Sequence, residues 1–189
     1  MSTLVLPDPS LVVLIGAAGS GKSTLAARLF DAQEILSSDA LRAAVSGDEA
    51  DQRASAVAFR ILHKMLEQRM ARRELTVVDA TNTKGEFRRP LLDRARATGV
   101  PTVALVLDLP PEIIRAQNAG RTNRVVDPAV VDRHIAAIRR TIDGGQLTAE
   151  GFDHVVVLRS RHDVATLRVE RRTPVRPREP ATGPAATSG

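Results

Sequence analysis

A glycine-rich segment at residues 16–23, GAAGSGKS, restricts the possible folds more than any other part of this 189-residue sequence. It fits the pattern G-x-x-x-x-G-K-[ST], follows an apolar run at 11–17 and opens a predicted helix at 22–30. Glycines let the backbone turn so that successive N–H groups point inward at phosphate oxygens, and the helix N-terminus adds a favourable potential for anions. The alternative is a glycine-rich turn that precedes a helix and binds nothing.

The glycine-rich segment predicts a site for the phosphates of ATP, with Mg²⁺ as the accompanying ion. Lys22 is expected to reach the β- and γ-phosphates, and the Ser23 hydroxyl is expected to hold Mg²⁺. The residues predicted to bind the nucleotide are Gly16, Gly19, Ser20, Gly21, Lys22, Ser23 and Thr24.

Short apolar segments alternate with amphipathic segments along the chain. The sequence predicts strands at 11–17, 34–38, 75–81, 102–109 and 154–158, and the longer predicted helices at 48–73, 87–99 and 127–142. Strands that are mostly apolar throughout and separated by helices are typical of a parallel sheet covered on both faces. The predicted fold class is therefore α/β: a P-loop NTPase with a five-stranded parallel sheet covered by helices on both faces.

The length predicts one P-loop domain at 11–172, with an N-terminal extension at 1–10 and a Pro/Ala-rich tail at 173–189 that should be disordered. The net charge of +5 comes mainly from residues 159–189, which hold seven arginines against three acids, so it does not by itself indicate a nucleic-acid partner. The absence of cysteine excludes disulfides and thiolate sites. With no long apolar run and no secretory signal, the expected compartment is the cytoplasm, without membrane contact.

An acid and a base lie three residues apart where the second predicted strand meets a helix, in ILSSDALR at 35–42. Ligands of such sheets bind beyond the carboxyl ends of the strands, which is where Asp39 is expected to lie. An aspartate there either ligates Mg²⁺ through water or accepts a proton from an attacking hydroxyl, and Arg42, one helical turn on, could bind a substrate phosphate. The alternative makes Asp39 a helix cap and Arg42 a surface residue. Asp79, at the end of another strand, is either a carboxylate beside Mg²⁺ or a turn residue or helix cap.

Six segments together resemble the polynucleotide 5′-hydroxyl kinase family, including the kinase domain of the bacterial RNA end-healing polynucleotide kinase-phosphatase. They are VVLIGAAGSGKSTLA at 12–26, SSDALR at 37–42, GDEADQ at 47–52, LTVVDATNT at 75–83, RRPLL at 88–92 and NAGRTNR at 118–124. The resemblance implies a P-loop kinase with a lid. It also implies catalytic roles for Lys22, Asp39, Arg42, Arg121 and Arg124: Asp39 as general base on the 5′-hydroxyl, Arg42 on the neighbouring substrate phosphate, and the two lid arginines on the donor phosphates.

The sequence also departs from that family. Multidomain relatives continue into a phosphatase and a nucleotidyltransferase, neither of which is expected here, and Gln117 stands where some relatives have a further lid arginine. The chain has no Trp or Tyr and only four Phe, so aromatic platforms for single strands are nearly absent. The expected partner is a 5′-hydroxyl RNA or DNA end; RNA versus DNA, the preferred donor and the oligomeric state are not predicted.

Two other functions remain open. A P-loop kinase for a small molecule, such as a nucleoside, metabolite or antibiotic, would use the same loop, base and lid. A nucleotide-dependent switch is disfavoured because the chain has no Asn-Lys-x-Asp or Asp-x-x-Gly motif. Among weaker candidates, Gln52 could touch substrate, Arg88 and Arg89 are predicted to be a solvated pair rather than a nucleic-acid contact, and His63 and His134 are predicted to be structural.

Overall fold

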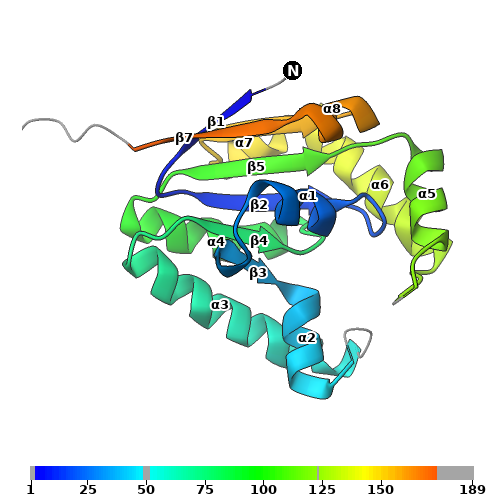
Figure 1. The fold of residues 1–189 in the computed structure, drawn as a ribbon, viewed down its shortest axis with the longest axis horizontal. Helices are drawn as coiled ribbons and strands as arrows, with labels where there is room; N and C mark the ends of the chain where they lie inside the picture. The colour runs from blue at the N-terminus through cyan, green and yellow to red at the C-terminus, as the bar shows by residue number, and fades with distance from the viewer. Residues whose placement is uncertain (1–2, 49–51, 123, 174–189) are drawn as a thin grey trace, which may run out of the picture.

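The computed structural model describes residues 3–48, 52–122 and 124–173. Its centre is a five-stranded parallel sheet with the order β3-β4-β2-β5-β6 (Figure 1). The strands are β2 (Leu11–Gly16), β3 (Ile35–Ser37), β4 (Thr76–Asp79), β5 (Thr102–Leu107) and β6 (His154–Leu158). Every residue of β2, β4 and β5 is buried, as expected for central strands covered on both faces. The predicted fold class is confirmed.

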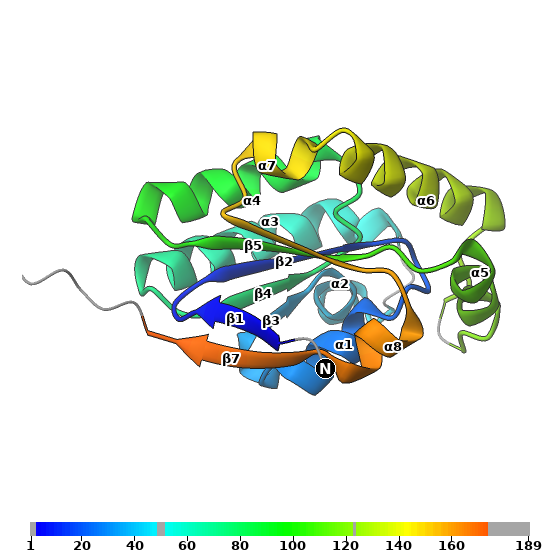
Figure 2. The ribbon, with the colours of Figure 1, turned by 90° about the horizontal axis from the view of Figure 1, so that it is seen from above.

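Helices cover both faces of the sheet, as Figure 2 shows from above. One face packs against α3 (Ser55–Ala71), α4 (Gly85–Thr98), α6 (Pro128–Asp143) and α7 (Gln146–Glu150), which share a core cluster with the strands. The other face packs against α1 (Lys22–Leu29), with α8 (Arg161–Thr166) beside it. Two further helices, α2 (Ser38–Ser46) and α5 (Pro111–Ala119), follow the carboxyl ends of β3 and β5 and so border the edge where ligands are expected.

A second, two-stranded sheet was not predicted from the sequence. In it β1 (Thr3–Pro7) pairs in parallel with β7 (Arg168–Arg172), which joins the two ends of the described chain. Leu4 and Leu6 are buried in the cluster that contains Phe30 of the α1 side. Residues 3–7 of the predicted extension therefore pack with the domain, while nearly all of the predicted tail lies outside the described residues.

Helix boundaries also differ from the predictions. After a short 3-10 turn at Gln52–Ala54, α3 begins at Ser55, whereas the sequence predicted a helix from residue 48. The short helices α7 and α8 were not predicted, and α8 is fixed by a capping box between Ser160 and Asp163. Within the described residues, no helix has the length and apolar character needed to cross a bilayer.

Candidate active site

The glycine-rich loop joins β2 to α1 and has the geometry that the motif predicts. Gly19 and Gly21 have φ of 82° and 90°, in the left-handed region that favours glycine. A Cβ at Gly19 would lie 2.8 Å from the backbone oxygen of Ile114 and from the backbone nitrogen of Asn118. The close approach of α5 is therefore a second reason why position 19 requires glycine. The loop is thus held tightly between the sheet and α5.

Lys22 is folded back over this loop. Its Nζ donates to the carbonyl oxygens of Gly16 and Ala17, both at 2.9 Å. Burial lowers the pKa of Lys22 from 10.5 to about 8; the carboxylate of Asp79 opposes this shift and Arg121 adds to it. A poorly hydrated ammonium beside a second cation favours a bound anion such as phosphate.

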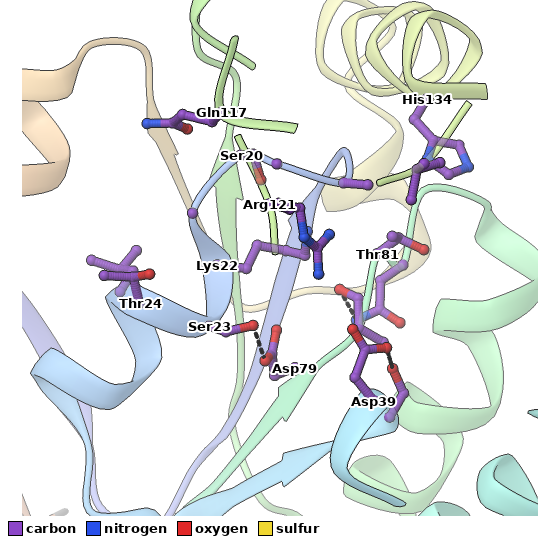
Figure 3. A pocket seen from close by; sticks show the side chains of 18 of the residues that line it. Ser20, Lys22, Ser23, Thr24, Asp39, Asp79, Thr81, Gln117, Arg121 and His134 are labelled. Carbon is purple, nitrogen blue, oxygen red and sulfur yellow. Dashed lines mark hydrogen bonds between the residues drawn. The ribbon is translucent and has the colours of Figure 1, made fainter. Parts of the chain in front are cut away.

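Oxygen ligands suited to Mg²⁺ lie at the start of α1. The Ser23 Oγ donates to Asp79 Oδ2 at 2.6 Å (Figure 3). Asp79 is brought there because β4 pairs with β2, so the end of β4 lies beside the start of the loop. The structure therefore favours the metal-side alternative for Asp79 over the turn residue. A hydroxyl and a carboxylate are hard oxygen donors of the kind that Mg²⁺ accepts together with phosphate oxygens.

The Ser20 hydroxyl, within the loop itself, supports the assignment of the loop as a phosphate site. Ser20 is buried, and its Oγ has no hydrogen-bond partner among the described residues. Buried hydroxyls without a partner are uncommon in proteins, and a phosphate oxygen in the loop would supply one. The residues present thus fit both a nucleotide and Mg²⁺.

Asp39 and Arg42 meet at the carboxyl end of β3. Ser37 of β3 pairs with Asp79 of β4, which places the next residues beside the metal-side carboxylate. Arg42 is buried and forms an ion pair with Asp39, whose side chain is about one-third exposed. The helix cap is Ser37, whose Oγ accepts from the Ala40 N–H at 3.3 Å, so the capping alternative for Asp39 is wrong.

One cavity of about 910 Å³ connects these groups. Thr24 and Gln117 lie on one side of Lys22 and Arg121, and Asp39, Thr81 and His134 lie on the other (Figure 3). Among the residues predicted to form the site, those that line the cavity are Gly19, Ser20, Gly21, Lys22, Ser23, Thr24, Asp39, Arg42, Arg121 and Arg124. Gly16 does not line the cavity. It packs closely beneath the loop, where a Cβ would lie 2.5 Å from Ser20 Oγ. The side chain of Gln52 lies outside the described residues.

The loop between α5 and α6 carries Arg121 and Arg124 to the cavity. Asn118 ties its two ends together: Asn118 Nδ2 donates to the Val126 carbonyl at 2.7 Å, and the Val126 N–H donates to Asn118 Oδ1 at 3.1 Å. The described part of the loop is irregular rather than helical. Asn118 was part of the quoted NAGRTNR segment but had no predicted role.

One part of the cavity lining was not predicted. It contains Val164 and Ala165 of α8, and Arg28 of α1 fixes α8 by donating to the carbonyls of Leu167 at 3.0 Å and Val164 at 2.5 Å. No local pattern in the sequence indicates this contact, because it joins residues about 136 positions apart.

The loop after β4 is fixed by a buried arginine. Arg88 of α4 donates to both carboxylate oxygens of Glu150, at 2.7 and 2.5 Å, and to the Asn82 carbonyl at 2.9 Å. Asn82, at φ 47°, donates in turn to the Leu14 carbonyl at 2.8 Å. The prediction of a solvated arginine pair is wrong for Arg88, which is fully buried, whereas Arg89 is exposed. Arg88 has helical spacing with buried Leu91, Leu92 and Ala95, a pattern that could have indicated its burial.

Comparison with known proteins places this site in a family. The model of the AAA domain family AAA_33 matches residues 11–144, which include the glycine-rich loop, Asp39 and both loop arginines. The chain belongs to this family. No curated protein matches the sequence.

Solved structures of similar fold include several kinases. A putative kinase from Chloroflexus aurantiacus J-10-fl has a TM-score of 0.57 at 13% identity, over 81% of this chain and 86% of that chain. A chain of the Pnkp1/Rnl/Hen1 RNA repair complex has a TM-score of 0.57 at 22% identity, over 73% of this chain but only 46% of that chain. A gluconokinase from Sinorhizobium meliloti 1021 has a TM-score of 0.52 at 20% identity, over 84% and 87%.

These similarities show that the chain shares the fold of P-loop kinases. They do not decide between acceptors, since they include an RNA repair protein as well as a gluconokinase. The finer resemblance to polynucleotide 5′-hydroxyl kinases therefore rests on the sequence segments.

Proposed function

We propose that this protein transfers the γ-phosphate of ATP, with Mg²⁺, to the 5′-hydroxyl end of RNA or DNA. The observation that carries the proposal is the pairing of Asp39 with the buried Arg42 at the cavity, one strand away from the Ser23–Asp79 pair. An acid for the acceptor hydroxyl and a cation for an acceptor phosphate are thus in contact with each other and adjacent to the donor phosphates.

Each group has a defined part in the transfer. The glycine-rich loop and Lys22 bind the β- and γ-phosphates. Ser23 and Asp79 would hold Mg²⁺, which would neutralise charge on the phosphate oxygens. Asp39 accepts the proton of the acceptor hydroxyl as its oxygen bonds to the γ-phosphorus. The bond between that phosphorus and the β,γ-bridging oxygen breaks, and ADP leaves. Arg121 and Arg124 neutralise the transferring group, and a planar guanidinium bridges two oxygens at once.

Arg42 is the group that favours a polynucleotide end. A buried guanidinium that lines the cavity beside Asp39 suits a substrate phosphate, because bidentate pairing with phosphate is strong and geometrically specific. The phosphodiester that follows the terminal nucleoside supplies a phosphate near the reacting hydroxyl. The fold similarity to a chain of an RNA repair complex is consistent with this acceptor.

A small-molecule acceptor is the second candidate. The gluconokinase aligns over 87% of its own length, whereas the RNA repair chain aligns over less than half, so a kinase of this size with a small acceptor has direct structural counterparts. Phe59 and Phe87 are the aromatic residues among the described cavity lining, which leaves little stacking surface for several bases.

An acceptor competition tests the proposal. The protein is incubated with γ-labelled ATP and Mg²⁺, and 5′-hydroxyl oligonucleotides of both sugars are offered beside nucleosides, gluconate and aminoglycosides. We expect label on the oligonucleotides. Arg42→Ala should weaken this transfer and should affect a nucleoside without phosphate less, while Arg72→Ala, at an exposed arginine that does not line the cavity, should behave as wild type. Label on small molecules alone would refute a polynucleotide acceptor.

A further inference from the structure

His134 lines the cavity, although histidines in this chain were predicted to be structural. It lies on α6, and Figure 3 shows it on the same side of Lys22 as Asp39 and Thr81, with Thr24 and Gln117 on the other side. In the proposed function, the glycine-rich loop binds the donor phosphates, and Asp39 accepts the proton of the acceptor hydroxyl beside them. An acceptor that reaches Asp39 therefore enters the half of the cavity that His134 borders.

The ring of His134 has one enclosed nitrogen. Its Nδ1 is buried and has no hydrogen-bond partner among the described residues. An unpaired buried N–H costs more than an unpaired buried lone pair, so the proton of the neutral ring belongs on Nε2. The donor edge of the ring is then Nε2–H, on a side chain that lines the cavity.

Charges around the ring favour the same state. The pKa of His134 is lowered by burial and by the cations Lys22, Arg133 and Lys84, so the ring is neutral near pH 7. The neighbouring cations also attract electron-rich atoms to this part of the cavity. A neutral N–H donor among cations suits an oxygen atom of the substrate.

We infer that His134 binds the acceptor by donating a hydrogen bond from Nε2 to one of its oxygen atoms. This inference rests on the proposed phosphotransfer and adds a contact from α6, opposite the Asp39–Arg42 pair on α2. His134 would thus determine acceptor affinity and leave ATP binding to the glycine-rich loop. The acceptor must then carry an oxygen besides the one that is phosphorylated, as a nucleotide end does in its sugar and phosphodiester.

Three variants isolate this hydrogen bond. His134→Phe keeps the size of the ring but removes the donor, and His134→Gln places an amide N–H near the position of Nε2. His63→Phe is the matched control, because His63 is also helical, half-buried, with an unpartnered buried Nδ1 and a lowered pKa, but it does not line the cavity. Melting temperatures of all three variants identify any that fail to fold.

The readouts are the acceptor KM and kcat with a 5′-hydroxyl trinucleotide, the ATP KM, and direct titration of the trinucleotide in the presence of a non-hydrolysable ATP analogue. Loss of one hydrogen bond should raise the acceptor KM and Kd about 3- to 10-fold in His134→Phe, with the ATP KM unchanged. His134→Gln should recover most of the affinity, and His63→Phe should match wild type.

The outcomes separate this inference from the proposed function. If wild type phosphorylates the trinucleotide and His134→Phe keeps its acceptor KM within twofold, the inference is wrong and the proposed function stands. An equal loss in His134→Phe and His63→Phe also overturns it. If wild type binds the trinucleotide without phosphorylating it, the proposed function fails and the titration still decides the contact. A trinucleotide that is neither bound nor phosphorylated overturns both.

Discussion

Removing the carboxylate of Glu150 should destabilise the fold far more than removing an exposed carboxylate. The Arg88 side chain is 1% exposed and that of Glu150 is 25% exposed, and two of the three hydrogen bonds of the guanidinium end on this carboxylate. Glu150→Ala leaves the buried cation with only the Asn82 carbonyl. Breaking a buried pair costs about 3–5 kcal/mol, and partial exposure of Glu150 places the loss near the lower end, about 3 kcal/mol.

Thermal and urea unfolding measure this loss. For a domain of this size, about 3 kcal/mol corresponds to a fall in Tm of about 6–12 °C. Asp132→Ala is the matched control: it breaks the pair of Asp132 with Arg115, whose side chains are 47% and 54% exposed, and should cost no more than about 1 kcal/mol. Equal small shifts in Glu150→Ala and Asp132→Ala would refute the reasoning that Arg88 fixes the loop after β4 through a desolvated charge.

Three further predictions concern the donor side. The first is that the ATP affinity of the wild type, measured by calorimetry from pH 7 to 9.5, should fall by up to tenfold per pH unit above about pH 8. The reason is that the pKa of Lys22 is lowered to about 8 and the ammonium form binds phosphate. Lys22→Ala should bind ATP weakly and lack this pH dependence. Arg121→Ala should lower kcat by about 10²–10⁴ in the label-transfer assay, and Arg121→Lys should recover little of it; a kcat within threefold of wild type for the Arg121→Ala, Arg124→Ala double variant would exclude a catalytic role. Asn118→Ala keeps the Cβ that packs on Gly19 but loses both hydrogen bonds to Val126, so urea unfolding should show a loss of about 1–3 kcal/mol in the free energy of unfolding. An unchanged unfolding midpoint would contradict the claim that Asn118 ties the two ends of the loop together.

Local patterns were sufficient to predict the sheet and the phosphate loop. The five strands of the central sheet are apolar and short, and the glycine-rich motif lies between one of them and a helix. The hydrophobic pattern and the motif therefore predict the same strand–loop–helix unit. The carboxyl ends of parallel strands share one edge, which is why Asp39 and Asp79 were both expected near the loop. These features depend on residues close together in the sequence.

Features that depend on distant residues were missed. The pairing of β1 with β7 joins residues 3–7 to 168–172, and the strand RVERR is mostly exposed, so neither its composition nor its neighbours indicate a strand. The carboxylate partner of Arg88 is Glu150, 62 residues away, which no local pattern indicates. His134 follows the helical period of α6, but only the assembled fold shows that its face of the helix borders the cavity.

The central claim is that Asp39 accepts the proton of a polynucleotide 5′-hydroxyl during transfer. The most direct measurement is single-turnover transfer from γ-labelled ATP to a 5′-hydroxyl oligonucleotide, followed by nuclease digestion to find which nucleotide carries the label, in wild type and in Asp39→Asn. The account predicts label on the 5′-terminal nucleotide only, with transfer about 10²–10⁴ slower in Asp39→Asn while ATP binding is nearly unchanged. Label at any other position, or a wild-type rate in Asp39→Asn, would contradict it.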